Sequence, residues 1–209
     1  MIPAAVALER LREGNRRFVS NIRSHESLAS EARRVEVAAG QQPFAIILGC
    51  SDSRVPAEIV FDQGLGDLFV IRVAGNIVAP SQIGSVEFAA EQFGTRLVVV
   101  LGHSQCGAVM ATIEQLMRPT ANHSNNLHSI VDRVRPSVEP LLAKHSIHSD
   151  ALLREAVRAN VRMSADQLRH GSEVLEQLIA ANGLVVVGAE YSLETGVVDF
   201  FEDESSGES

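Results

Sequence analysis

Two cysteines and one histidine stand where apolar runs of the sequence end. The first run stops at Cys50 in "ILGCSDSRVPAE", residues 47–58. The second ends in "VVVLGHSQCGAV", residues 98–109, where two residues separate His103 from Cys106. The chain contains no further cysteine. Two thiolates and one imidazole make a three-ligand zinc set with the fourth position free, which is the pattern of catalytic rather than structural sites.

Asp52 and Arg54 follow the first cysteine closely. A carboxylate beside a metal-bound water can orient that water, but left to itself it tends to become the fourth ligand. Arg54 could hold Asp52 off the metal by bonding both carboxylate oxygens. The alternative is that Asp52 caps a turn, that Arg54 makes a surface pair and that both cysteines fill a core. Gly49 and Gly107 favour an accessible site, since core filling does not require glycine.

Four short β-branched runs without polar alternation predict strands that are buried on both faces. They cover residues 44–50, 68–75, 96–103 and 183–191. Segments with helical spacing lie before and between them, in residues 3–20, 81–94 and 150–183. This alternation predicts an α/β fold with a mostly parallel central sheet flanked by helices.

The end of the chain and the order of the strands complete this prediction. Residues 197–201, which follow the turn "SLETG", predict an antiparallel strand at the sheet edge. In open parallel sheets, sites gather at the carboxyl ends of the strands, near a switch in strand order. If strands 44–50 and 96–103 are neighbours, Cys50, His103 and Cys106 meet at one point.

No linker rich in Gly, Ser or Pro divides the 209 residues. We therefore expect a single domain, with a helical arm (1–40), an α/β core (43–202) and an acidic tail (203–209). The net charge of −8 argues against a nucleic-acid partner, because phosphate binding needs a basic face.

The composition also bears on location. No apolar stretch approaches the roughly 20 residues of a membrane-spanning helix, and the amphipathic N-terminus lacks the pattern of a secretory signal. We expect a cytoplasmic protein without a membrane partner. In a reducing cytosol, two cysteines are more often ligands, reactive thiols or core residues than a disulfide.

"CSDSR" and "HSQCG" together are similar to the paired motifs of the β-class carbonic anhydrases, and the sequence resembles that family over nearly its whole length. The resemblance implies reversible hydration of carbon dioxide to bicarbonate and a proton by zinc-bound hydroxide. It implies one Zn²⁺ per chain on Cys50, His103 and Cys106, with Asp52 and Arg54 as the catalytic dyad. It also implies a homodimer, often paired into a homotetramer, whose N-terminal helix lies over the partner.

The resemblance also implies a substrate pocket. The matching positions are Gln41, Phe69, Ala74, Phe88 and the backbone amide of Gly107, some of them reached across the dimer interface. An apolar wall suits carbon dioxide, and amide donors suit the developing bicarbonate. Ordinary core packing is the alternative for the two phenylalanines.

One departure from a subgroup of that family is informative. An allosteric bacterial subgroup has a tryptophan where this sequence has Ile47, although Arg72 matches the arginine of that subgroup. We therefore expect no second bicarbonate pocket of that kind, and a site that Asp52 leaves open near neutral pH. The route of the proton is not assigned. The histidines outside the motif are His25, His123, His128, His145, His148 and His170.

Three other functions remain open from the sequence. A hydrolase of carbon disulfide or carbonyl sulfide could use the same zinc site. A cysteine hydrolase could use Cys50 as nucleophile and His103 as base. A non-enzymatic zinc module could have Asp52 as a permanent fourth ligand.

Overall fold

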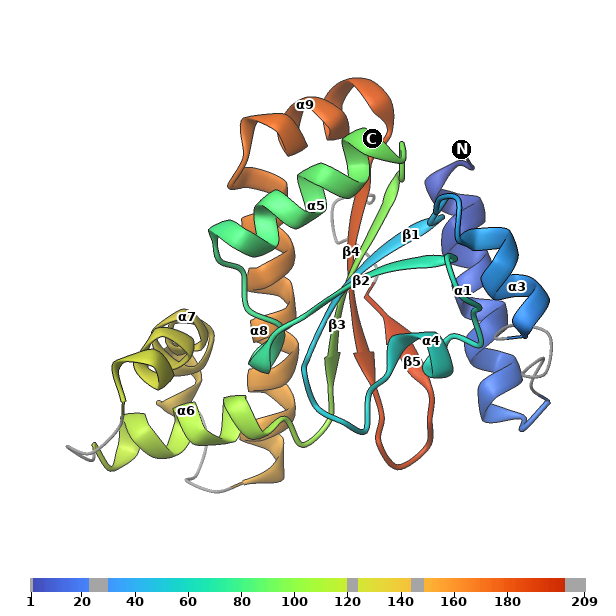
Figure 1. Cartoon of the computed structure of the whole chain (residues 1–209). Helices are drawn as coiled ribbons and strands as arrows, with labels where there is room; N and C mark the ends of the chain where they lie inside the picture. The colour runs from blue at the N-terminus through green and yellow to red at the C-terminus, as the bar shows by residue number, and fades with distance from the viewer. Residues whose placement is uncertain (1, 23–29, 120–123, 144–148, 202–209) are drawn as a thin grey trace, which may run out of the picture.

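The computed structural model describes residues 2–22, 30–119, 124–143 and 149–201. A five-stranded sheet runs through this described part (Figure 1). The strands are β1 (Ala45–Gly49), β2 (Leu68–Arg72), β3 (Leu97–His103), β4 (Val185–Tyr191) and β5 (Val198–Phe200). Their order is β2-β1-β3-β4-β5, with β5 antiparallel to β4 and the other pairs parallel. The predicted α/β fold with an antiparallel edge strand is confirmed.

Helices cover both faces of this sheet. In Figure 1, α1 and α3 lie on one face, α5 and α8 lie on the other, and α6 and α7 lie near the end where β3 terminates. The described helices are α1 (Ala4–Val19), α3 (Glu31–Val37), α4 (Ala57–Val60), α5 (Pro80–Gln92), α6 (Gly107–Met117), α7 (Asn125–Leu142), α8 (Asp150–His170) and α9 (Glu173–Asn182), with a short 3₁₀ turn η1 (Ala74–Asn76). Among them, none is long and apolar enough to cross a membrane.

The long helical segment predicted at 150–183 is two helices. Helix α8 ends at His170, and α9 begins after Ser172, whose hydroxyl accepts a hydrogen bond from the Leu175 amide at 3.2 Å. A serine that caps the next helix favours a break over continuous helix. The predicted acidic tail at 203–209 lies outside the described residues.

The central strands explain why their sequences are continuous apolar runs. Ile47 of β1 faces the cluster that includes α1, and the adjacent Ile46 and Leu48 face the cluster that includes α5 and α8. Every residue of β1 and β3 is buried. Since helices cover both faces, the alternation of polar and apolar residues seen in half-exposed strands is absent.

Helix α1 packs against the core of its own chain. Ala7 and Leu11 are fully buried there. The Asn15 amide donates to the carbonyl oxygens of Val60 (3.1 Å) and Gly196 (2.8 Å), and its oxygen accepts from the Val198 amide at 2.9 Å. One side chain thus joins α1 to the end of α4 and to β5. That this helix also lies over a partner stays a prediction.

Asn15→Ala should destabilise the fold. It leaves three backbone groups without their partner, two of them buried and one partly buried, which costs about 2–3 kcal/mol of unfolding free energy. Chemical denaturation followed by circular dichroism measures this, with the exposed Glu13→Ala in the same helix as control. Equal stability of the two variants would contradict the assigned role of Asn15.

Candidate metal centre

The ends of two neighbouring strands bring the three expected ligands together. Cys50 directly follows β1, and His103 is the last residue of β3. Cys106 directly precedes α6. The strands pair in parallel, with Gly49 opposite Leu101, so both end at the same edge of the sheet. The ligand atoms of the three residues lie within 4.8 Å of one another, and all three residues are buried.

His103 has the hydrogen-bonding pattern of a metal ligand. Its Nδ1 lies 2.9 Å from the carbonyl oxygen of Ser104. A carbonyl only accepts, so Nδ1 carries the hydrogen and Nε2 keeps a lone pair. This Nε2 is buried, and among the described residues no group hydrogen-bonds it. Metal-bound histidines are held in this way, with the second ring nitrogen donating to a carbonyl.

The two thiols are a strongly coupled pair. The hydrogen bond with Cys106 lowers the pKa of Cys50 to about 4, against the opposing effect of burial. The same bond, together with burial, raises the pKa of Cys106 far above its usual value. The pair therefore shares one proton, and a divalent cation can replace that proton as the partner of both sulfurs.

Backbone amides around both sulfurs favour their anionic form. The Gly75 amide donates to Cys50 Sγ at 3.4 Å. The amides of Val109 and Ala108, at the beginning of α6, lower the pKa of Cys106. Burial lowers the pKa of the His103 imidazole, but Cys50, the Ser104 carbonyl and Asp52 together outweigh this effect, so that its pKa is raised overall. This donor set of two thiols and one imidazole fits a soft or borderline divalent cation.

Asp52 and Arg54 form a bidentate pair beside these ligands. Arg54 Nε lies 2.9 Å from Oδ1 of Asp52, and its terminal nitrogen lies 2.7 Å from Oδ2. These bonds hold the pKa of Asp52 far below its usual range, so the carboxylate stays ionised. Asp52 Oδ2 lies 3.8 Å from His103 Nε2. The structure thus places a carboxylate next to the ligands and holds both of its oxygens on a guanidinium.

Arg72 is a structural member of the site whose role the sequence did not reveal. Its guanidinium donates to the carbonyl oxygens of Cys50 (3.0 Å) and Asp52 (2.6 Å). It therefore fixes the loop that carries both side chains. Little in the sequence indicated this role, since a single arginine at the end of a strand can form many different contacts.

Two of the expected pocket residues lie at the metal centre. Gly107 directly follows Cys106, and Ala74 precedes Gly75, whose amide contacts Cys50. Ala74 also lines a cavity of about 240 Å³ with mostly apolar walls from α6 and α7. The other lining residues are Ala108, Ala111, Gln115, Leu127, His128, Ile130 and Val131. An apolar cavity thus adjoins the ligands.

The other three pocket residues lie away from the ligands of their own chain. Gln41 lines a cavity with Phe93 and Arg96, which precede β3, so it lies at the amino ends of the strands. The rings of Phe69 and Phe88 are 6.2 Å apart, and Phe88 also contacts Phe93 at 5.7 Å. Phe88 is 51% exposed. Because Phe93 contacts both rings and lines the same cavity as Gln41, the three residues lie on one side of the fold.

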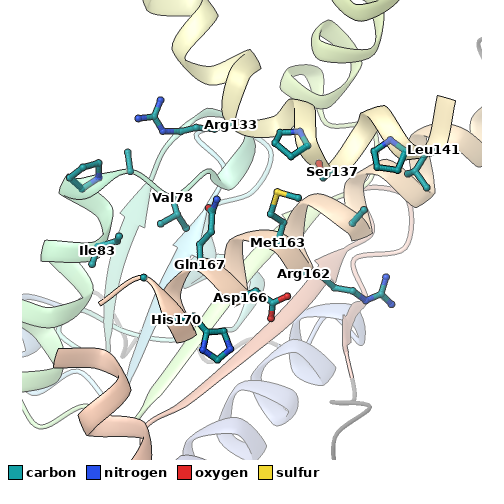
Figure 2. A pocket seen from close by; sticks show the side chains of 16 residues that line it. Val78, Ile83, Arg133, Ser137, Leu141, Arg162, Met163, Asp166, Gln167 and His170 are labelled. Atoms are coloured by element: carbon teal, nitrogen blue, oxygen red, sulfur yellow. The ribbon is translucent and has the colours of Figure 1, made fainter. Parts of the chain in front are cut away.

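A larger groove lies elsewhere on the molecule. It has a volume of about 870 Å³ and lies between α7, α8 and the beginning of α5, with Arg133, Ser137 and Met163 on its walls (Figure 2). None of the ten expected site residues lines it. His170 lines this groove, while His128 lines the cavity beside the metal centre. The remaining candidate histidines, His25, His123, His145 and His148, lie outside the described residues.

Comparisons with known proteins place the chain in a family. A sequence model of the carbonic anhydrase family matches residues 45–198. The structure of a Coccomyxa β-carbonic anhydrase is similar with a TM-score of 0.71 and 25% identity, over 92% of this chain and 85% of that one. The chain belongs to the β-carbonic anhydrase family.

Relatives match this family member over most of its length. Carbonic anhydrase 2 of Mycobacterium tuberculosis is 41% identical over 192 residues, which cover 91% of this chain and 89% of that protein. The carbonic anhydrase of Mycolicibacterium smegmatis is 40% identical over 92% of this chain and 91% of its own length. The β-carbonic anhydrase CafA of Aspergillus fumigatus has the same fold, with a TM-score of 0.73 and 24% identity over 95% of this chain and 90% of that one.

Cys106→Ser should remove the metal from this β-carbonic anhydrase. The variant replaces a thiolate by a hydroxyl, which does not ionise near neutral pH and is a poor ligand for a soft cation. Elemental analysis of the purified protein should give about one equivalent for the wild type and far less for the variant. Gln105→Asn, at the exposed position between His103 and Cys106, is the control that should keep its metal. Full metal content in Cys106→Ser would exclude Cys106 as a ligand.

Proposed function

We propose that the chain catalyses the reversible hydration of carbon dioxide to bicarbonate and a proton with one Zn²⁺ held by Cys50, His103 and Cys106. The observation that carries the proposal is the convergence of these three ligands within 4.8 Å, beside a carboxylate held by Arg54. The family to which the chain belongs supports the reaction. Its relatives in two mycobacteria are named carbonic anhydrases.

Zinc would supply what the side chains lack, a coordinated water that ionises near neutral pH to give the nucleophile. Cys50 and Cys106 would bind as thiolates and His103 through its neutral Nε2. Two thiolates cancel the charge of the cation, so the reacting water needs further help from the protein. Asp52, whose carboxylate lies next to the ligands, would give this help to the water.

Asp52 would accept a hydrogen bond from the reacting water and orient a lone pair of that water toward carbon dioxide. Arg54 bonds both carboxylate oxygens and thereby keeps Asp52 ionised and off the fourth ligand position. A carboxylate that accepts two bonds from a planar guanidinium has a fixed orientation. The pair thus orients the water without blocking the site.

The walls of the site suit the substrate and the product. Ala74 and the small apolar cavity that it lines would hold carbon dioxide, which is apolar and gains little from polar groups. The amide of Gly107 lies at the N-terminus of α6, where backbone donors and the helix dipole favour an anion. It would donate to an oxygen of bicarbonate as negative charge develops there.

The complete site would form in a homodimer. Gln41 lies at the amino ends of the strands, and Phe69 and Phe88 contact Phe93, which lines the same cavity as Gln41. Each chain would therefore complete the site of its partner. The half-exposed Phe88 is then buried in the assembly. A similar fold from Sordaria macrospora is described as that of a tetrameric β-carbonic anhydrase, which supports an assembly of this kind.

We also infer a cytoplasmic location. Both cysteines are free thiols at one site, and such a pair persists in a reducing compartment.

Asp52→Asn should keep its zinc and lose about a hundredfold in the rate of carbon dioxide hydration, because a neutral amide accepts a weaker hydrogen bond from the water and loses the charged pair with Arg54. Stopped-flow measurement of the rate, together with metal analysis, tests this. A fully active variant at every pH would overturn the role of Asp52.

Assays of the wild-type protein distinguish this proposal from the three other functions that the sequence left open. Carbon disulfide and carbonyl sulfide test the related hydrolases with wild-type protein. A cysteine hydrolase would resist chelators and lose activity on alkylation, whereas the proposed enzyme should lose its activity with its zinc. A metal-loaded wild type that hydrates no carbon dioxide would support a non-enzymatic zinc module.

A mixture of two inactive variants tests the shared site. Chains with Asp52→Asn and chains with Gln41→Ala are each impaired alone. In a hybrid dimer, one site has native ligands and dyad from the Gln41→Ala chain and native Gln41 from its partner. An equal mixture after subunit exchange should recover about a quarter of wild-type activity, since half of the dimers are hybrid and half of their sites are native.

The control mixture pairs Asp52→Asn with Arg54→Ala. Both changes lie in the same half of the site, so every site in this mixture carries one of them and no recovery is expected. Absence of recovery in the Gln41 mixture, with subunit exchange shown by mass spectrometry, would place Gln41 outside the partner's site.

A further inference from the structure

The turn η1, which contacts the metal centre, does not hold its shape by local interactions alone. Gly75 and Asn76 both have positive φ, at 71° and 44°. Successive residues in this region are uncommon, and only glycine adopts it at no cost. A Cβ on Gly75 would lie 3.0 Å from the Cβ of Ala108, so a side chain at this position would also crowd α6. Such a turn needs partners elsewhere in the fold.

Asn160 of α8 is that partner. It is 1% exposed, and its amide donates to the Gly75 carbonyl oxygen at 2.8 Å. The amide of the same Gly75 donates to Cys50 Sγ at 3.4 Å. Gly75 is therefore held at both ends, by α8 through its carbonyl and by a metal ligand through its N–H. A buried asparagine on a helix that packs mostly through apolar groups is costly unless its hydrogen bonds are made.

We propose that Asn160 is a positioning residue of the metal centre, which acts through Gly75 to set the position and electron density of the Cys50 sulfur. The hydrogen bond from Asn160 fixes the orientation of Gly75, and the Gly75 N–H withdraws charge from the thiolate and restrains its rotation. Groups that hold a ligand in this way typically change metal affinity by about 10- to 100-fold when removed. The inference rests on the metal binding proposed above and not on the reaction.

Asn160→Leu replaces the amide by an apolar side chain with the same number and branching of heavy atoms. It should weaken Zn²⁺ binding about tenfold, measured by competition with a chromophoric chelator. In the Co²⁺-substituted protein, the sulfur-to-cobalt charge-transfer band should move to longer wavelength, because a sulfur that loses its hydrogen bond gives up electrons more easily. Asn160→Ala leaves room for a water that can donate to Gly75, so its band should move less, although its cavity is larger. The melting temperature of each metal-free variant shows how much the substitution destabilises the fold, independently of metal binding.

Ser164→Ala is the matched control. Ser164 is also buried on α8, four residues and one helical turn further along, and its variant should leave the affinity and the band unchanged. The proposal is overturned if Asn160→Leu is folded and keeps both wild-type values, or if Ser164→Ala changes them as much. A wild type that binds no metal would instead overturn the proposed function.

Discussion

The mutual repulsion of two thiolates is the constraint on which the site depends. Cys50 and Cys106 are both buried, where water cannot screen their charges, so without a cation they retain one proton between them. A divalent ion removes this conflict by neutralising both charges. The imidazole of His103 adds a third donor without further charge. The rest of the site would then have to compensate for a metal whose positive charge is already cancelled.

The sheet provides this compensation through its register. Because β1 and β3 are adjacent and parallel, their carboxyl ends deliver Cys50 and His103 to the same edge. The end of β2 brings Arg72 to the loop that carries Asp52. The 3₁₀ turn that follows β2 brings the Gly75 amide to the sulfur. Three neighbouring strand ends thus set the ligands, the dyad and their hydrogen bonds together.

The distribution of the proposed pocket residues would make catalysis depend on assembly. Ala74 and Gly107 lie with the ligands, whereas Gln41 lies beyond the amino ends of the strands. A strand of five residues is about 16 Å long, so a side chain at one end cannot contact a ligand at the other. A half-exposed phenylalanine on α5 is consistent with burial against a second copy.

The sequence by itself determined the strand pattern, the fold class and the residues able to bind a metal, because buried parallel strands and thiol ligands leave strong local signals. It did not separate α8 from α9, whose helical spacing continues through the break at Ser172. Only the tertiary structure decided the contributions of Arg72, Gly75 and Asn160. Their hydrogen bonds join residues 20 to 85 positions apart, and no local pattern encodes such contacts. The role of a buried asparagine or of a residue with positive φ depends on its neighbours, which only the tertiary structure shows.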